Sequence, residues 1–333
     1  IATVMGIATS IGLGIMQIGG GLNHLFDVPN NNFTKILITI LMVAIFLGSS
    51  LTGLNHGVKW LSNLNILLGA ILLIFILIFG DLKFILESYT LAISDYLQHF
   101  IEYSLRVNPY SGDDSWIQQW TVFYWAWVIS WSPFIGGFVA RVSRGRTIRE
   151  FVVGVLIIPP LISFTWIAGF GGTAIKLALN HNDKLVHIVD KDYTVALFEL
   201  LSHFPLSEVT SSLAIVLIFI FIVTSADSTT HIVAGMATGG AINPSLKHKV
   251  LWGLLIGAIS VAMTIAGGLK SLQTASVITG LPFSIILLLM IFSLMRALKR
   301  EPIHHFKMTS IDDEKDYSIS LEEREKQDEQ ENQ

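Results

Sequence analysis

The sequence predicts an all-α integral membrane protein with about eight transmembrane helices. Hydrophobic residues make up 52% of its 333 residues, charged residues only 14%, and the mean hydropathy is +0.62, unlike ordinary soluble domains. Apolar runs long enough to cross roughly 30 Å of hydrocarbon recur along the chain. Lysine and arginine gather in short connections between these runs, as in multi-pass proteins. The chain has no cysteine, which excludes disulfides and cysteine-based metal sites.

The apolar runs define the predicted spans in order. They lie at about 1–21, 35–54, 63–80, 119–140, 151–170, 209–233, 250–268 and 276–295. The first run is already under way at Ile1, with no initiator methionine and no cleavage signal. We therefore expect the chain to be a piece of a longer protein.

Basic connections orient these spans. "ARVSRGRTIRE" at 140–150, "KHK" at 247–249 and "RALKR" at 296–300 should stay in the cytoplasm. With eight alternating spans, both ends of this chain are then cytoplasmic. The long polar connections at 81–118 and 171–208 fall outside. The position of the arginine-rich loop beside a span favours topology and lipid headgroups over nucleic acid as its partner.

Two polar segments complete the organisation. Residues 86–107 carry apolar positions at helical spacing between charges, which predicts an amphipathic helix at the outer interface. The acidic tail at 301–333 has too few apolar residues to bury and is expected to be disordered or only partly helical.

Aromatic residues crowd the fourth span, "WTVFYWAWVISWSPF" at 120–134. At 100° per residue one stripe, about 80° wide, gathers five of them, whereas Trp125 points away. The stripe consists of Trp120, Tyr124, Trp127, Trp131 and Phe134. Trp127 and Trp131 lie about 10 to 18 Å inside the span, too deep for an interfacial belt. Buried ring faces bind quaternary ammonium ions at about 2 kcal/mol per contact; helix packing is the alternative.

The same span should be weakened near its inner half. Pro133 removes one backbone hydrogen bond, and Gly136 and Gly137 follow it. We expect the helix to kink or unwind there, as helices do where they line a cavity.

A second polar group, "FIVTSADSTTH" at 221–231, lies at the inner end of the sixth span. An aspartate beside hydroxyl residues in a membrane helix needs pairing, water or a cation. Thr224 and Ser225 offer the hard oxygen ligands that alkali cations use. A polar helix end with hydroxyls bonded back to carbonyls is the alternative.

The first span carries small residues at Gly6, Ser10 and Gly14, a spacing that favours close helix packing. No P-loop, HExxH or GxSxG motif is present in the sequence, so neither an ATP motor nor these hydrolases is supported. We do not expect an enzyme.

The aromatic stretch, followed by "ARVSRGRTIREF", resembles the signature of the betaine/choline/carnitine transporter family. "ATSIGLG", "FGGTAI" and "TSADS" fall in the family's order. The resemblance implies a LeuT-like architecture of two inverted five-helix repeats preceded by two extra helices. Residues 1–80 would then be the last three helices of the first repeat, 81–118 an external segment and 119–300 the second repeat. The chain would be the C-terminal two-thirds of a glycine betaine or choline transporter.

The resemblance also implies binding residues. Trp127 and Trp131 match tryptophans that line the substrate path, and Phe123 matches an aromatic that borders it. Tyr124 completes the candidate set from the stripe. The family usually carries a further tryptophan at position 128, where this chain has Val128, so one ring of the family's aromatic box is replaced.

Ion coupling is implied in the same way. Phe221, Thr224 and Ser225 match one sodium site of the family. Thr3 and Phe134 match a second proposed site, but Ile7 replaces its other threonine. One coupling sodium is therefore better supported than two, and no other cofactor is implied.

The leading hypothesis is uptake of glycine betaine or choline by alternating access in a bacterial plasma membrane, coupled to a cation and used for osmoprotection. Exchange of carnitine or another trimethylammonium solute without sodium is one alternative. A non-transporting membrane sensor or channel is another. The family includes trimers, so a homotrimer is one expectation for the assembly.

Overall fold

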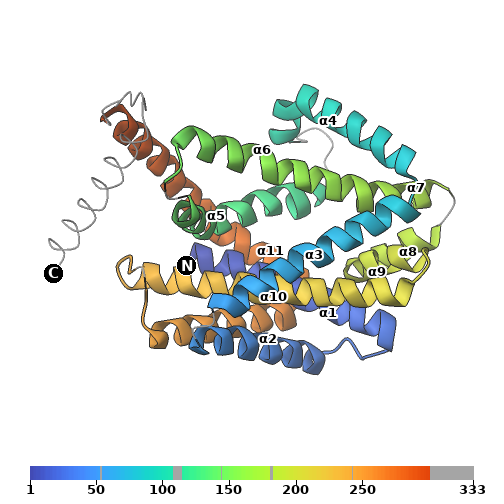
Figure 1. Ribbon diagram of the computed structural model, residues 1–333, viewed down its shortest axis with the longest axis horizontal. Coiled ribbons are helices and arrows are strands. Elements are labelled where there is room, and N and C mark those ends of the chain that lie inside the picture. Colours follow the sequence, from blue (N-terminus) through green and yellow to red (C-terminus); the bar gives the residue numbers. More distant parts are fainter. Residues whose placement is uncertain (53–54, 108–114, 144, 181–182, 242, 301–333) are drawn as a thin grey trace, which may run out of the picture. The chain divides into compact units, whose positions relative to one another are not determined.

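The protein is described by a computed structural model that covers residues 1–52, 55–107, 115–143, 145–180, 183–241 and 243–300. Every element in these ranges is a helix (Figure 1), which confirms the all-α prediction. The acidic tail at 301–333 lies outside the described residues.

The described helices follow one another along the chain. Their bounds are α1 Ala2–Phe26, α2 Asn32–Thr52, α3 Asn55–Phe79, α4 Leu82–Ser104, the π-helical η1 Ile117–Val122, α5 Phe123–Val142, α6 Ile148–Trp166, the π-helical η2 Ile167–Gly172, α7 Thr173–Leu179, α8 Asp183–Lys191, the 3₁₀ turn η3 Tyr193–Val195, α9 Ala196–Ser202, α10 Ser207–Ala237 and α11 Leu246–Arg300.

Seven helical stretches among the described residues are long and apolar enough to cross a membrane. Six of them each overlap one predicted span, with α6, η2 and α7 forming a single stretch, Ile148–Leu179. The seventh, α11, has 55 residues, about 80 Å if straight, which far exceeds one bilayer crossing. Gly268 interrupts the helix with φ 56° and ψ −133°, a conformation that glycine adopts readily because it has no Cβ atom. The two last predicted spans lie on either side of this break.

The core of the compact unit Ile1–Ser284 is built around α1. This helix packs against α2, α5 and α10, and α10 also packs against α2 and α3 (Figure 1). One buried cluster joins Ile7, Ile11 and Ile15 to residues of α2, α5 and α10. The described part of the second unit, Ile285–Arg300, is the last stretch of α11.

Small residues let α1 approach its neighbours closely. A Cβ atom on Gly6 would lie 2.9 Å from the backbone nitrogen of Trp131 in α5. One on Gly14 would collide with the side chain of Ile222 in α10. The prediction that these glycines serve helix packing is therefore confirmed.

Helix α5 stays helical through its proline. Pro133 lies inside the helix Phe123–Val142, so the alternative that the helix unwinds here is wrong. Because proline has no N–H, the carbonyl of Ile129 loses its usual helical donor. The hydroxyl of Ser132 donates to that carbonyl instead, at 2.7 Å. This local substitute keeps the helix continuous.

The segment predicted to be an amphipathic helix, 86–107, lies largely in α4, which runs from Leu82 to Ser104 with a kink at His99. Asp81 caps it by accepting a hydrogen bond from the N–H of Phe84 at 3.0 Å. The ammonium of Lys176, from α7, also donates to Asp81 and lies 5.0 Å from the centroid of the Phe84 ring. The Lys176 hydrogen bond, followed by that from Phe84, lowers the pKa of Asp81 from its ordinary value of 3.8. One exposed ion pair thus joins the start of α4 to α7.

Candidate functional site

The rings of α5 form two groups. In the first, Phe123 and Trp127 are nearly parallel, with ring centroids 5.7 Å apart and an interplanar angle of 3°. Tyr124 contacts Trp127 at 5.7 Å and Trp120 at 6.3 Å. In the second, Trp131 contacts Phe134 at 5.8 Å. The predicted stripe is therefore a chain of ring contacts from Trp120 to Trp127, followed by a separate pair.

Trp127 is anchored to α1. Its indole Nε1–H donates to the carbonyl of Gly6 at 3.0 Å and to the hydroxyl of Ser10 at 3.2 Å. Ser10 itself donates to the same carbonyl at 3.2 Å. Indole has one polar hydrogen, and both of its acceptors lie on α1. Trp127 can therefore offer a ligand its ring face, while its N–H is engaged by the protein.

The two sides of α5 differ in exposure. Phe123 and Phe134 are buried, with 1% and 4% of their surface exposed. Tyr124, Trp125 and Val128 are exposed, each by at least half. The open side of the helix thus carries a tyrosine, a tryptophan and, at position 128, a valine.

Trp131 lies between these sides. It is half-buried and packs against the main core cluster, and the close approach of Gly6 fixes the backbone at this position. The structure thus brings Phe123, Tyr124 and Trp127 into direct contact and places Trp131 one turn further along α5.

The candidate ion ligands on α10 share one turn. Phe221, Thr224 and Ser225 follow the i, i+3, i+4 spacing of a single helix face. The Thr224 hydroxyl lies 3.0 Å from both the Ile220 and the Phe221 carbonyls, to which it can donate. Its hydrogen is used within the helix, which leaves the oxygen lone pairs for another partner. Phe221 is 54% exposed, and the hydroxyl residues are half-buried. The donor set suits a hard cation.

The two residues of the second candidate ion site are more deeply buried. Thr3 on α1 is 8% exposed and Phe134 on α5 is 4% exposed. Phe134 belongs to the same buried cluster as Val4 and Ile7 of α1. Ile7 contributes no oxygen, so this location offers fewer cation ligands than the turn on α10.

A buried group of hydroxyls escaped the sequence reasoning. Thr9 of α1 hydrogen-bonds the hydroxyl of Ser276 at 2.9 Å and lies 3.3 Å from the carbonyl of Leu272. Ser130 of α5 donates to the carbonyl of Ser276 at 3.3 Å. Thr9, Ser130 and Ser276 have no exposed surface. They connect α1, α5 and α11. Hydroxyls in the middle of two predicted spans and at the start of a third were the available signal.

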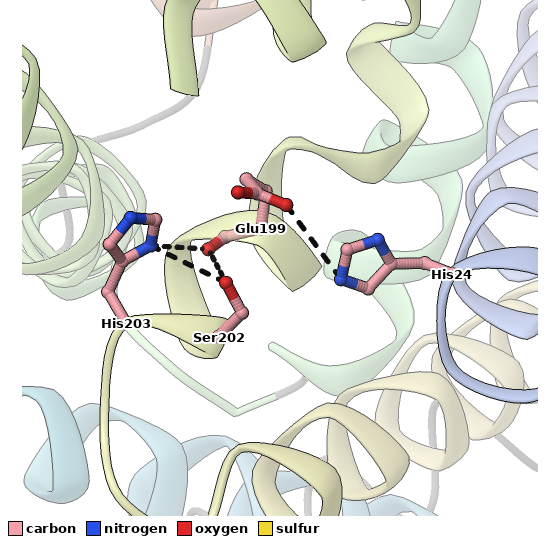
Figure 2. Close-up of polar contacts among 4 residues, drawn as sticks. All are labelled: His24, Glu199, Ser202 and His203. Carbon is pink, nitrogen blue, oxygen red and sulfur yellow. Dashed lines mark hydrogen bonds and ion pairs between the residues drawn. The ribbon is translucent and has the colours of Figure 1, made fainter. Parts of the chain in front are cut away.

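A buried acid at the other end of α1 was also missed. Figure 2 shows Glu199 of α9 paired with His24 of α1, with a nitrogen to oxygen distance of 4.0 Å. The Glu199 carbonyl accepts from Ser202 at 2.7 Å and lies 2.8 Å from Nδ1 of His203. The Glu199 side chain is 4% exposed beside the buried Phe198. An acid within the apolar stretch "LFELL" was the signal for such a pair.

Comparison with known proteins identifies the family of the chain. The sequence model of the betaine/carnitine/choline family transporters matches residues 1–303. The chain belongs to this family. It is a family of transporters and not of enzymes, and its members are multi-pass membrane proteins, as the seven apolar helical stretches indicate here.

Several curated relatives are similar over most of the chain. An ectoine/hydroxyectoine transporter of Virgibacillus pantothenticus is 51% identical over 90% of this chain and 60% of its own length. A glycine betaine transporter of Bacillus subtilis is 43% identical over 90% of the chain and 58% of its own length. A glycine betaine/proline/choline transporter of Vibrio parahaemolyticus is 40% identical over 91% of the chain and 54% of its length. The chain thus spans a little more than half the length of these relatives.

Proposed function

We propose that the protein to which this chain belongs takes up a small zwitterionic or quaternary ammonium osmolyte across a bacterial plasma membrane. The observation that carries the proposal is the ring cluster of Phe123, Tyr124 and Trp127, with Trp131 one turn away, on a helix that packs against α10, the helix with the candidate cation ligands. Ring faces attract a cation that cannot donate hydrogen bonds, and hydroxyls attract a small hard cation. A co-transporter needs both kinds of site.

Glycine betaine and choline are the first candidate substrates. Both carry a trimethylammonium group, and two of the similar relatives are named as transporters of one or both. In our proposal Trp127 and Trp131 contact this group, and Phe123 and Tyr124 border its path.

Ectoine is the second candidate, and Val128 favours it. The family usually carries a tryptophan at this position, and Val128 is 57% exposed on the open side of α5. One ring is therefore absent from a surface that a ligand could approach. Ectoine is a cyclic zwitterion with a planar, delocalised cation that presents N–H groups. Such a cation depends less on enclosure by several rings than a trimethylammonium group does. The 51% identical relative is named as an ectoine/hydroxyectoine transporter.

Sodium is the proposed coupling ion. Phe221, Thr224 and Ser225 would hold it through carbonyl and hydroxyl oxygens, as the chemistry of this turn allows. Thr3 and Phe134 mark a second, weaker candidate. Accumulation then requires that the sodium gradient drives alternate exposure of the substrate site to the two sides. Both ends of this chain would lie in the cytoplasm, and a homotrimer is the assembly we propose to look for.

The direct experiment measures uptake of radiolabelled glycine betaine, choline and ectoine by the full-length protein, reconstituted in vesicles with an inward sodium or potassium gradient. We expect saturable, sodium-dependent uptake of one or more of them. Trp131→Ala should reduce it at least tenfold, since a desolvated cation–π contact contributes about 2 kcal/mol. The matched control Trp116→Ala, at a ring with 62% of its surface exposed, should leave it near wild type.

Three results would contradict the proposal. Absence of uptake for all three solutes would exclude the substrate class. Normal uptake by Trp131→Ala would show that this ring does not bind the substrate cation. Ionic conductance without saturable accumulation would indicate a channel instead.

A further inference from the structure

The orientation of Trp127 is set by one contact on the face of its ring and another at the edge that carries Nε1. Phe123, which is 1% exposed, stacks on it at an interplanar angle of 3°. Its Nε1–H is held 3.0 Å from the carbonyl of Gly6 and 3.2 Å from the hydroxyl of Ser10. Stacking alone lets the indole slide across the neighbouring ring, whereas a hydrogen bond at one edge fixes the position of that edge.

Ser10 contacts both the Gly6 carbonyl and the Trp127 indole. Its hydroxyl donates to the Gly6 carbonyl at 3.2 Å and accepts from the indole. The Gly6 carbonyl therefore receives both the serine and the indole donor. A Cβ atom on Gly6 would lie 2.9 Å from the backbone nitrogen of Trp131, so α1 and α5 are already in close contact at this level. Moving the two helices apart would lengthen the hydrogen bonds from the indole to Gly6 and Ser10.

We infer that Ser10 is a positioning residue for the substrate-facing ring of Trp127. The hydroxyl holds the indole so that its ring face, and not its N–H, meets the cation. This inference rests on the proposed function, because it assigns Ser10 a role at the same substrate site.

A consequence for specificity follows from the occupied N–H. A zwitterionic osmolyte carries a carboxylate that would attract any accessible N–H donor. With the Trp127 donor engaged by Gly6 and Ser10, the carboxylate must be held by other groups. The ring then selects the cationic end of the solute alone, which orients the solute within the site.

The experiment removes the hydroxyl and tests whether the effect passes through the indole. In the full-length protein, Ser10→Ala should raise the KM for uptake roughly three- to tenfold, the net value of about one hydrogen bond, with the maximal rate unchanged. In a Trp127→Phe background, which keeps a ring and lacks the N–H, the same change should alter KM less than about twofold. The control Ser260→Ala removes a buried hydroxyl that donates to Ile256 within its own helix at 2.7 Å, and should leave KM unchanged.

A second readout does not depend on transport. With indole-¹⁵N-labelled tryptophan, the Nε1–H resonance of Trp127 is identified by its loss in Trp127→Phe. We expect it to move upfield in Ser10→Ala and to stay in place in Ser260→Ala, because a weaker hydrogen bond shields the proton.

These readouts separate the inference from the proposed function. A lower maximal rate with unchanged KM, or a Trp127 resonance that does not move in a protein that transports, would overturn the positioning role alone. If the wild type takes up none of the solutes but the Trp127 resonance still moves in Ser10→Ala, the proposed function is overturned. The hydrogen bond from the indole to Ser10 is then still supported.

Discussion

Helices α1 and α6 are both apolar and long enough to serve as spans, yet the protein uses them differently. Fourteen of the 25 residues of α1 are buried, whereas none of the 19 residues of α6 is. The stretch that contains α6 is nevertheless the more hydrophobic of the two. Within a membrane, hydrocarbon is as apolar as leucine, so hydrophobicity does not drive one helix against another. Small residues and hydroxyls distinguish the buried helix from the exposed one.

Glycines make the contrast concrete. A Cβ atom on Gly12 of α1 would lie 2.7 Å from the Leu272 side chain, and one on Gly21 would overlap the ring of Phe198. Gly154 of α6 has open space around it, with no such atom within 4 Å. The same residue type therefore permits helix contact in α1 and meets no neighbour in α6.

The largest expected effect tests this contrast directly. Gly6→Val should lower the stability of the full-length protein by about 2 to 3 kcal/mol, because its first added atom already meets the backbone of Trp131 and Ser130, which cannot rotate away. Gly154→Val is the matched substitution and should change stability by less than about 0.5 kcal/mol. Thermal unfolding in detergent measures both. Equal shifts for the two variants would contradict the division between a packed and an exposed helix.

A smaller effect is expected at the C-terminal end of α1. Glu199→Ala should destabilise the protein by about 2 kcal/mol, since it removes the buried partner of His24 and leaves a cavity beside Phe198. Ser202→Ala removes an exposed hydroxyl one turn away, also shown in Figure 2, and should cost less than about 0.5 kcal/mol. The comparison uses the same unfolding assay. A neutral Glu199→Ala variant would show that glycine packing alone holds α9 to α1.

The smallest effect concerns the exposed region, where α7 is joined to α4 by the ion pair between Lys176 and Asp81. Because the pKa of Asp81 is lower in the folded protein, its contribution is fully present above about pH 4 and disappears as the pH falls through the folded-state pKa. Asp81→Asn keeps an oxygen for the N–H of Phe84 but removes the charge. We expect unfolding temperatures of wild type and variant to differ by a constant amount near neutral pH and to converge below about pH 4. Curves that stay parallel in acid would show that the ion pair does not stabilise the contact.

The sequence by itself determined the class of the protein and its spans. Composition, apolar runs and basic connections identified an all-α membrane protein, and helical spacing identified the segment that forms α4. The motifs around Trp127 and Thr224 identified the family. These features are local, because hydropathy and helical periodicity depend on residues a few positions apart.

Only the tertiary structure decided how these residues are used. It placed the indole of Trp127 on Gly6 and Ser10, more than a hundred residues earlier, and joined Thr9 to Ser276. It also showed that Ser132 replaces the donor that Pro133 lacks, so that α5 continues where the sequence suggested a break. Hydropathy ranks transfer into lipid and does not say which face of a helix meets another helix. That choice depends on close approach at glycines and on hydrogen bonds between distant segments, which appear only when the helices are packed.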